Sequence, residues 1–280
     1  MKIIKKVFRN NYKLNGEKAN YKKVNLEWWN SQKNLGDYLS KVVYEWMLKR
    51  EQINSNQKIS HTIHLLGIGS ILGMGNFDAV VWGSGIHTIA SIRLILDRRK
   101  RINYDIRLVR GPITRAILKD AGYVCPKRFG DPAVLMPLIY TPKKIKKVYK
   151  YGIIKHLSQN DENLRNNTVS SIKYLNIKTL DYKSFINSIL QCETIISSSL
   201  HGIILAESYG VPAIFLSDGV ENEIIKYIDW YLSTNRTNIK IAKNIEDAFK
   251  MKPMELPNLE EMQKCVISAF PYDLWEKRTK

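Results

Sequence analysis

Short runs of apolar residues alternate along the chain with longer stretches in which apolar side chains recur at helical spacing. Continuous apolar runs of strand length, separated by helices, are typical of parallel strands that are buried on both faces. We expect strands at 63–67, 79–82, 106–109, 123–125, 151–157, 172–175, 194–197 and 213–216. The alternation predicts an α/β fold.

Several of the expected helices have recognisable ends. Pro112 stands where a first helical residue belongs, and Gly122 stands where the chain leaves that helix. Asn34 and Asp181 are candidate N-caps, because their side chains can accept hydrogen bonds from the first helical turn. A further helix is expected over 201–209.

A Lys-rich stretch at 141–150 follows a segment marked by prolines and is the best candidate for a linker. We therefore divide the chain into two Rossmann-like domains, 1–145 and 146–258, that enclose a central cleft. The remaining segment, 259–280, is expected to carry a helix that packs back on the first domain. A chain of 280 residues is long enough for two α/β domains of ordinary size.

The chain is strongly basic, with 44 Lys and Arg against 26 Asp and Glu and a net charge of +18. Such a balance favours anionic partners, among them phosphate-bearing substrates, anionic membranes and nucleic acid. The charge is spread along the sequence, with a local peak at 143–150. Two interpretations of this peak stay open: a solvated lysine surface, or a patch that contacts acidic lipid or a lipid diphosphate.

Cysteine content and hydropathy bear on where the protein works. Cys125, Cys192 and Cys265 are far apart and form no CxxC, which argues against a disulfide framework and against a zinc site. The segment 1–11 is basic but lacks the apolar stretch of a signal peptide. No run of about 20 apolar residues is present to span a bilayer. We expect a cytoplasmic protein with peripheral contact at the inner face of the membrane.

Two joints between a strand and a helix carry polar side chains, at 106–115 and at 194–202. Ligands of open α/β sheets bind outside the carboxyl ends of the strands. A helix N-terminus at the same place offers unpaired N–H donors and a positive dipole end, which suit an anion. Because the two joints fall in different halves of the chain, a cleft would bring them face to face.

In the first joint, Arg110 directly follows an apolar strand. Its planar guanidinium could hold a carboxylate or a phosphate through two parallel hydrogen bonds, or it could pair with an acidic residue of the fold. The hydroxyl of Thr114 could contact the same anion or serve the helix alone. Two glycine turns, Gly69-Ser70 and Gly83-Ser84, are either phosphate nests or tight turns.

Two histidines stand at expected strand ends. His201 follows a Ser-Ser-Ser-Leu run and precedes a glycine, which favours a functional role. His156 closes an apolar strand and is a weaker candidate. His61, His64 and His87 have no comparable setting and are interpreted as structural or surface residues.

Several known motifs are missing from the sequence. It contains no dinucleotide fingerprint and no Walker A loop. The absence of HExxH, of an EF-hand loop and of a dense His/carboxylate cluster gives no support to a metal site. Zinc-finger spacing and an RNA-recognition motif are missing as well, so nucleic acid is not an expected partner.

Taken together and in order, short segments over residues 34–232 resemble the polysaccharide pyruvyltransferase family, and most closely its exopolysaccharide and capsular branch. Any one segment is weak, but the ordered set is specific. The segments are Asn34-Leu35-Gly36-Asp37, Gly67-Ile68-Gly69-Ser70, Val81-Trp82-Gly83-Ser84-Gly85, Val109-Arg110-Gly111-Pro112-Ile113-Thr114, Gly130-Asp131-Pro132-Ala133, Ser198-Ser199-Leu200-His201-Gly202 and Gly210-Val211-Pro212.

The resemblance implies two Rossmann-like domains in a glycosyltransferase-B-like arrangement. It also implies phosphoenolpyruvate as the donor substrate and a sugar diol as the acceptor, in bacterial-type surface polysaccharide synthesis, with no further cofactor. Residue by residue it covers Arg110, Ser199, Leu200, His201, His156, Lys226, Asp229 and Asp37. At His156 the match is incomplete, because Lys155 replaces the proline that the family often has there.

The implied chemistry needs an acid for the methylene carbon of phosphoenolpyruvate, a base for the sugar hydroxyls and fixed positive charge around the donor. We assign His201 to the acid or to phosphate contact, and Arg110 and Lys226 to the anionic groups of the donor. Asp37, Asp229 and His156 are equal candidates for the base.

Two rival functions share parts of this pattern. A glycosyltransferase that uses a nucleotide sugar has the same fold and a basic cleft, and a fold does not determine a function. A non-catalytic protein that binds nucleic acid or anionic membrane would account for the charge of +18. It would leave the strand-end Arg and His residues unexplained.

Overall fold

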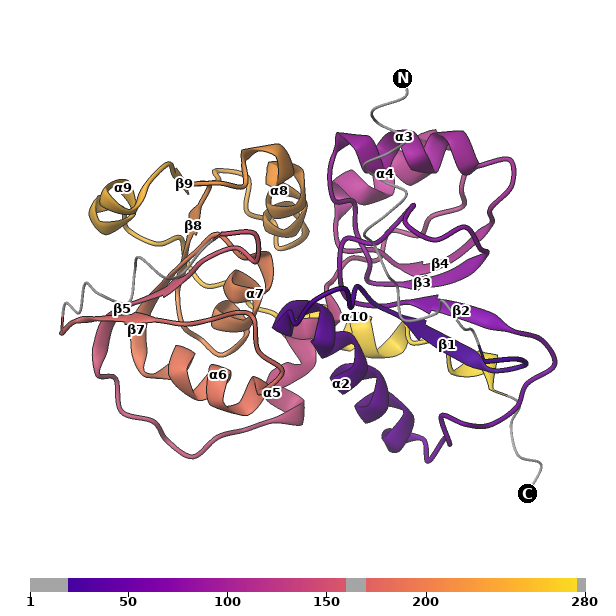
Figure 1. Ribbon diagram of the computed structural model, residues 1–280, viewed down its shortest axis with the longest axis horizontal. Coiled ribbons are helices and arrows are strands. Elements are labelled where there is room, and N and C mark those ends of the chain that lie inside the picture. Colours follow the sequence, from indigo (N-terminus) through magenta and orange to yellow (C-terminus); the bar gives the residue numbers. More distant parts are fainter. Residues whose placement is uncertain (1–19, 160–169, 276–280) are drawn as a thin grey trace.

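The computed structural model describes residues 20–159 and 170–275 and contains two parallel β-sheets lying side by side (Figure 1). The basic segment 1–11, where we expect no signal peptide, lies outside the described residues. Within them, no helix is long and apolar enough to cross a bilayer.

The first sheet has four strands in sequence order, β1-β2-β3-β4, and each pairs in parallel with the next. The strands are β1 (Val24–Glu27), β2 (Ile63–Leu66), β3 (Ala79–Trp82) and β4 (Tyr104–Leu108). Helices α2 (Leu35–Arg50) and α3 (Ile89–Arg98) lie between strands in the sequence, and α4 (Pro112–Asp120) follows β4. Helices α3 and α4 cover one face of this sheet, and α2 lies on the other (Figure 1). Both faces are therefore covered, as parallel strands require.

The second sheet has the order β6-β5-β7-β8-β9, again entirely parallel. Its strands are β5 (Tyr149–Ile154), β6 (Ile172–Tyr174), β7 (Cys192–Ser197), β8 (Ala213–Leu216) and β9 (Ile241–Ala242), and its helices are α6 (Tyr182–Leu190), α7 (Leu200–Ser208), η3 (Glu221–Glu223), α8 (Ile224–Ser233) and α9 (Ile245–Lys250). Helix α8 faces α4 of the first half (Figure 1).

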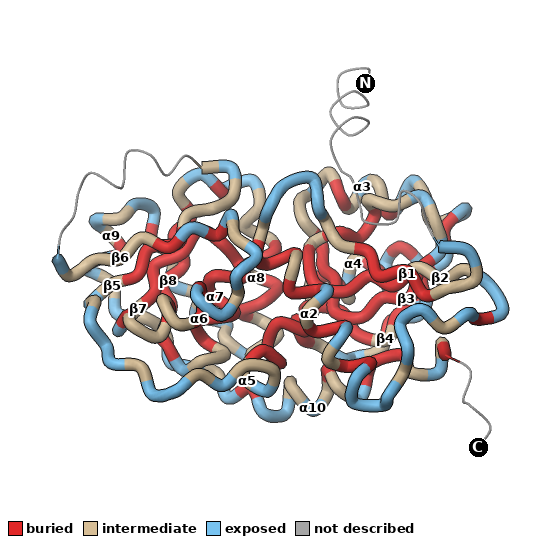
Figure 2. The backbone as a smooth tube through the Cα atoms, turned by 60° about the horizontal axis from the view of Figure 1, so that its bottom comes forward, coloured by how far each residue is buried: buried red, intermediate tan, exposed pale blue. Residues whose placement is uncertain are grey.

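One hydrophobic cluster spans both halves, and each half has a smaller cluster of its own. Leu35, Leu39, Val43 and Met47 recur at helical spacing along α2 and are completely buried, and they belong to the same cluster as Ile203 of α7. Buried residues accordingly follow the strands and continue through the middle of the molecule (Figure 2). The connection between the sheets begins with η1 (Pro132–Leu135) and α5 (Met136–Ile139).

The last described elements, α10 (Glu260–Ser268) and η4 (Tyr272–Leu274), lie against the first half. The indole nitrogen of Trp82 donates to the carbonyl of Val266 at 2.9 Å, and the ring of Trp82 meets Phe270 edge to face at 4.8 Å. Arg107 of β4 forms a salt bridge with Asp273 at 2.8 Å. After the second sheet, the chain thus packs against β3 and against β4, the edge strand of the first sheet.

The prediction of an α/β fold is confirmed, and the sheets are parallel as expected. The expected strand at 123–125 is wrong: Tyr123 and Cys125 are buried but Val124 is 91% exposed, and the nearest ladder contact is a single bridge between Val109 and Phe129. The glycosyltransferase-B-like arrangement and the domain boundary near 145 stay predictions.

Most helix ends lie where the sequence placed them. Pro112 is the first residue of α4, and Gly122 follows its end with φ +85°. The carboxylate of Asp181 accepts from the N–H of Ser184 at 3.0 Å and caps α6. Asn34 occupies the N-cap position of α2, but its side chain makes no cap hydrogen bond, because its amide donates to the carboxylate of Asp37 instead.

Candidate active site

A cavity of about 250 Å³ lies between the two halves, at the carboxyl ends of strands from both sheets. This is where parallel sheets bind ligands, because the loops that follow the strands converge there. The lining residues are Trp29, Gln32, Asn34, Asp37, Ser70, Ile71, Met74 and His87 from the first half and His156, Leu157, Ser158, Ser199, Leu200, His201, Glu223 and Lys226 from the second.

His201 is the second residue of α7, whose N-cap is Ser199. Its ring packs on Gly36, where an added Cβ would lie 2.2 Å from Nδ1, so this position in α2 has no room for a side chain. Its Nε2 lies 3.4 Å from Oδ2 of Asp131. Asp131 is completely buried, and neither of these two atoms has a hydrogen-bond partner among the residues that the structure describes. The carboxylate of Asp131 is therefore the acidic group that faces Nε2 of His201.

Asp37 lies in the first turn of α2 and is 8% exposed. Burial raises the pKa of its carboxyl to about 6, although the charge of His201 and the hydrogen bond from Asn34 pull that pKa down. A Cβ at Gly69 would lie only 3.0 Å from Oδ1 of Asp37, and Gly69 has φ +120°, so the turn after β2 closes tightly over this carboxylate. A carboxyl group with a pKa near 6 can exchange protons at neutral pH.

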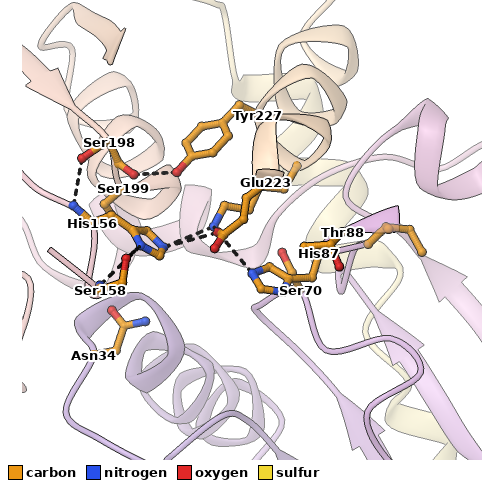
Figure 3. A network of polar contacts seen from close by, with 12 residues as sticks. Asn34, Ser70, His87, Thr88, His156, Ser158, Ser198, Ser199, Glu223 and Tyr227 are labelled. Carbon is orange, nitrogen blue, oxygen red and sulfur yellow. Dashed lines mark hydrogen bonds and ion pairs between the residues drawn. The ribbon is translucent and has the colours of Figure 1, made fainter. Parts of the chain in front are cut away.

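At the other side of the cavity, the carboxylate of Glu223 lies among three basic side chains (Figure 3). Its Oε2 is 3.1 Å from Nε2 of His87 and 3.4 Å from Nε2 of His156, and it forms a salt bridge with Lys226. His87 belongs to the first half of the chain and the other three residues to the second. This cluster therefore joins the two halves across the cavity.

Burial and neighbouring charge shape the titration of this cluster. Burial and the charge of Lys226 lower the pKa of His156 to about 4. Burial also lowers the pKa of Lys226, against the raising effect of Glu223. Burial alone would raise the pKa of Glu223, but a hydrogen bond from His87 and the charge of Lys226 hold that pKa well below its usual range. Glu223 is consequently ionised at neutral pH.

Arg110 does not line the cavity. Its side chain is completely buried, and its guanidinium donates to Oγ of Ser70 at 2.6 Å and to the carbonyl of Ile86 at 2.7 Å. Its Nε lies 3.5 Å from Oδ2 of Asp229. In this structure Arg110 reaches the cavity only through Ser70, whose hydroxyl it orients.

Asp229 and Thr114 also lie behind the cavity. The carboxylate of Asp229 accepts from the N–H groups of Ile113 and Thr114 at 2.8 and 3.1 Å and from the hydroxyl of Thr114 at 2.7 Å. A Cβ at Gly111 would lie 2.1 Å from the carbonyl oxygen of Asp229, so only glycine fits there. Asp229 of α8 therefore caps α4 from the opposite half of the molecule.

The two glycine turns close the loops behind the cavity. Gly83 has φ +96°, and a Cβ there would lie 2.3 Å from the ring of Pro132. The hydroxyl of Ser84 donates to the carbonyl of Gly69 at 2.9 Å and accepts from the N–H of Ile71 at 3.3 Å. These groups have partners within the chain, and of the two turns only Ser70 lines the cavity.

The structure thus brings Asp37, His156, Lys226 and His201 together around one cavity, along with Ser70, Ser199 and Leu200. Sequence reasoning missed four of their neighbours: Trp29, His87, Asp131 and Glu223. His87 was interpreted as structural or surface, although it follows the carboxyl end of β3, where the strand-end rule that singled out His201 also applies. Glu223 precedes Lys226 by three residues, a spacing that on its own indicates only an ordinary helical ion pair.

Among the residues that the structure describes, no group of three or more His, Cys, Asp or Glu side chains is arranged to hold a metal ion. The cavity instead combines basic side chains with two carboxylates of different character. Glu223 is ionised and paired, whereas Asp37 has a pKa near neutrality. Such a site can hold an anion and move a proton.

Comparison with known proteins adds the following. Residues 1–220 match the family described as polysaccharide pyruvyl transferase. An uncharacterized protein of Acanthamoeba polyphaga mimivirus is 28% identical over 224 residues, which are 76% of this chain and 74% of the viral protein. The succinoglycan biosynthesis protein ExoV of Rhizobium meliloti (strain 1021) is 26% identical over 213 residues, which are 72% of this chain and 62% of ExoV.

A crystal structure of a functionally uncharacterized protein from Klebsiella pneumoniae matches with a TM-score of 0.49 at 14% identity, over 86% of this chain and 96% of that one. The family match covers most of the chain, including every residue of the cavity up to His201. The similarity to ExoV supports the exopolysaccharide branch. The chain belongs to the polysaccharide pyruvyl transferase family.

Proposed function

We propose that the chain transfers the pyruvyl unit of phosphoenolpyruvate to two hydroxyls of a sugar, forming a cyclic ketal and releasing phosphate, in exopolysaccharide synthesis. The observation that carries this proposal is that Asp37, whose pKa is about 6, and His201 line the same cavity, whose far side is basic. Family membership and the similarity to ExoV support the same reaction.

In the proposed reaction a proton adds to the methylene carbon of phosphoenolpyruvate, which becomes the methyl group of the ketal. One sugar hydroxyl bonds to the central carbon, the carbon–oxygen bond to phosphate breaks, and the second hydroxyl closes the ring. Two hydroxyl protons are lost: one balances the proton on the methyl group and the other leaves with phosphate. The reaction consumes no oxidant and no further cofactor.

His201 is the proposed acid, because it lines the same cavity as Asp37 and its Nε2 lies 3.4 Å from the buried carboxylate of Asp131. Asp37 is the proposed base, because a carboxylate with a pKa of about 6 is more basic than an ordinary one and still largely ionised at pH 7. Asp229 is engaged in capping α4, and the pKa of His156 is lowered to about 4, so both are weaker choices.

We propose that the acceptor sugar binds against the apolar side of the cavity. Trp29, Ile71 and Met74 line that side, next to the loops after β1 and β2. A sugar ring has an apolar face of C–H groups that suits an indole or a thioether, and its hydroxyls then point toward polar side chains. This arrangement leaves the basic side for the anionic donor.

The direct test is a thermal-shift titration with phosphoenolpyruvate, run in parallel with uridine and guanosine diphosphate sugars at one ionic strength. A ligand that binds only the folded state raises the melting temperature by mass action. We expect a shift with phosphoenolpyruvate that is reduced in His201→Gln and kept in His61→Gln, since His61 is exposed and contacts Ser60. A shift with a nucleotide sugar alone would make the protein a glycosyltransferase.

We also propose that the acceptor sugar is linked to a lipid diphosphate, on the ground of charge. Lys143, Lys144 and Lys146 are exposed along the connection between the two sheets. Lys147, in contrast, donates its ammonium to the carbonyl of Cys192 and is tied to the fold. The free lysines could contact a lipid diphosphate or an anionic membrane.

A further inference from the structure

One oxygen of Glu223 is the meeting point of basic groups from three separate elements. His87 follows β3, His156 follows β5, and Lys226 lies in α8. Oε2 of Glu223 is 3.1 Å from the first, 3.4 Å from the second, and in a salt bridge with the third. Nζ of Lys226 and Nε2 of His156 are themselves 3.4 Å apart. The three basic side chains thus form a compact anion site, and Glu223 fills it.

The position of Glu223 in the fold allows it to leave this site. It ends η3, a 3₁₀-helix of three residues, which follows Gly219 at φ +74°. Its side chain is 20% exposed, whereas the side chain of Lys226 is only 8% exposed. A glutamate on a short turn can change rotamer without disturbing α8. Lys226 cannot follow it into solvent and needs a negative partner in place.

We propose that the carboxylate of Glu223 stands in for the phosphate group of the anionic substrate, and that a phosphate dianion displaces it to bind His87, His156 and Lys226. This inference rests on the proposed function only in taking the phosphate to be that of phosphoenolpyruvate. A dianion carries one more negative charge than the carboxylate and offers more acceptor oxygens to the same three donors. Phosphate is therefore the stronger ligand of this site.

The exchange has a consequence for catalysis. Burial and the charge of Lys226 lower the pKa of His156 to about 4, so this imidazole is neutral at pH 7. A phosphate dianion beside it favours the protonated form more strongly than the single charge of Glu223. His156 can then donate to the oxygen of the departing phosphate. Binding of the substrate would in this way protonate the residue that assists the departure of its phosphate.

The experiment is an isothermal titration with inorganic phosphate at pH 7 and constant ionic strength, on the full chain and on Glu223→Gln. Removing the competing carboxylate is expected to tighten phosphate binding about tenfold or more, because phosphate then no longer has to displace a charged group from the same donors. The matched control is Glu221→Gln, which removes the same charge two residues away on an exposed position of η3. Its affinity should stay within about twofold of the unmodified chain.

Unchanged or weaker phosphate binding in Glu223→Gln overturns the proposal, because Glu223 would then be a supporting member of the site and not its occupant. Equal tightening in Glu221→Gln also overturns it, since the effect would then come from net charge. A second readout is thermal melting: Glu223→Gln should melt lower than the unmodified chain in buffer free of phosphate and regain the difference when phosphate is added. A loss that phosphate does not restore counts against the exchange.

The two proposals can fail separately. Tighter phosphate binding in Glu223→Gln, together with no phosphate release from phosphoenolpyruvate with any sugar, would keep this site and reject the proposed reaction. Turnover of phosphoenolpyruvate without tighter phosphate binding would keep the reaction and reject the exchange. Pyruvate, which carries a carboxylate but no phosphate, is the third titrant. Tightening with pyruvate but not with phosphate would assign the site to the donor carboxylate and overturn the proposal as stated.

Discussion

Two charged clusters join the halves of this molecule, and they differ in how completely they are enclosed. In the rear cluster, made of Arg110, Thr114 and Asp229, the charged side chains are at most 1% exposed. In the front cluster, made of His87, His156, Glu223 and Lys226, the carboxylate is 20% exposed and borders the cavity. Both clusters place a carboxylate of the second half against groups of the first.

The difference separates a structural clamp from an exchangeable site. The carboxylate of Asp229 has partners from α4 on both oxygens, and Arg110 is held by Ser70 and Ile86. Glu223 has basic partners only, and those partners suit any anion of similar size. Changes in the rear cluster should therefore cost stability, whereas changes in the front cluster and at His201 should alter binding and turnover.

The largest effect is expected at His201. Replacement by Gln keeps a polar side chain on Gly36 but removes the proposed proton donor, so turnover should fall by about 10²- to 10⁴-fold. The rate is compared per folded protein, because His201 is buried against Gly36 and Asp131 and its replacement also lowers stability. Phosphate release from phosphoenolpyruvate measures the rate, and His61→Gln is the control. If His201→Gln unfolded more easily but its folded fraction kept full activity, His201 would be a structural residue and this contrast would fail.

Asp229→Ala should be the most destabilising change. It leaves Arg110 buried without its carboxylate and removes the acceptor for the first N–H groups of α4. Breaking one partner of a buried ion pair costs about 3–5 kcal/mol. Urea unfolding measures this cost. The control is Asp218→Ala, which breaks a pair with Lys155 in which the carboxylate is 48% exposed and should cost less than about 1 kcal/mol. Similar costs for both would show that the rear cluster is no clamp.

Asp37→Asn is expected to stabilise the protein at pH 7 while abolishing turnover. The pKa of Asp37 is raised in the folded state from 3.8 to about 6. Its contribution to stability is therefore present below about pH 4 and lost as pH rises through 6. Avoiding the buried charge should add about 2–3 kcal/mol at pH 7 and nothing at pH 4. Unfolding at the two pH values tests this, with exposed Asp120→Asn as the control.

Much of the fold could be predicted because parallel strands are nearly uniform in hydrophobicity. The strands at 79–82 and 213–216 were placed correctly for this reason. Strand β1 was missed because its buried positions include Asn25 and Glu27, whose polar groups are satisfied by contacts that sequence does not show: Asn25 bonds to Asn20, and Glu27 to His64. Strand β9 has only two residues, too short for a pattern.

The site was predicted less completely, because burial decides which polar residues face a ligand. The sequence singled out Arg110 and His201 by the same strand-end rule, yet one is buried behind the cavity and the other lines it. The sequence immediately around Arg110 and His201 does not distinguish these two cases. Glu223 and Asp131 were missed because their histidine partners, His87, His156 and His201, lie more than 60 residues away along the chain.

Thr114→Val tests the rear cluster more gently. The change removes the hydroxyl that donates to Asp229 at 2.7 Å and accepts from the N–H of Ile86 at 3.1 Å. Leaving two buried partners unsatisfied should cost about 1–3 kcal/mol in urea unfolding. Thr114→Ser keeps the hydroxyl and should recover most of this cost. A variant of unchanged stability but reduced affinity for phosphoenolpyruvate would move Thr114 from the clamp to the binding site.

The smallest effect is expected at His87, the contribution of the first half to the front cluster. Its side chain is 25% exposed and contacts Glu223 at 3.1 Å. His87→Gln should weaken phosphate binding by about threefold to tenfold, which corresponds to roughly 0.7–1.4 kcal/mol, and should barely change the melting temperature. The weakening should persist in the Glu223→Gln background, since His87 then contacts the phosphate and no longer a carboxylate. If the affinity change disappears there, His87 acts only through Glu223, and the link across the cavity is a structural one like that of Asp229.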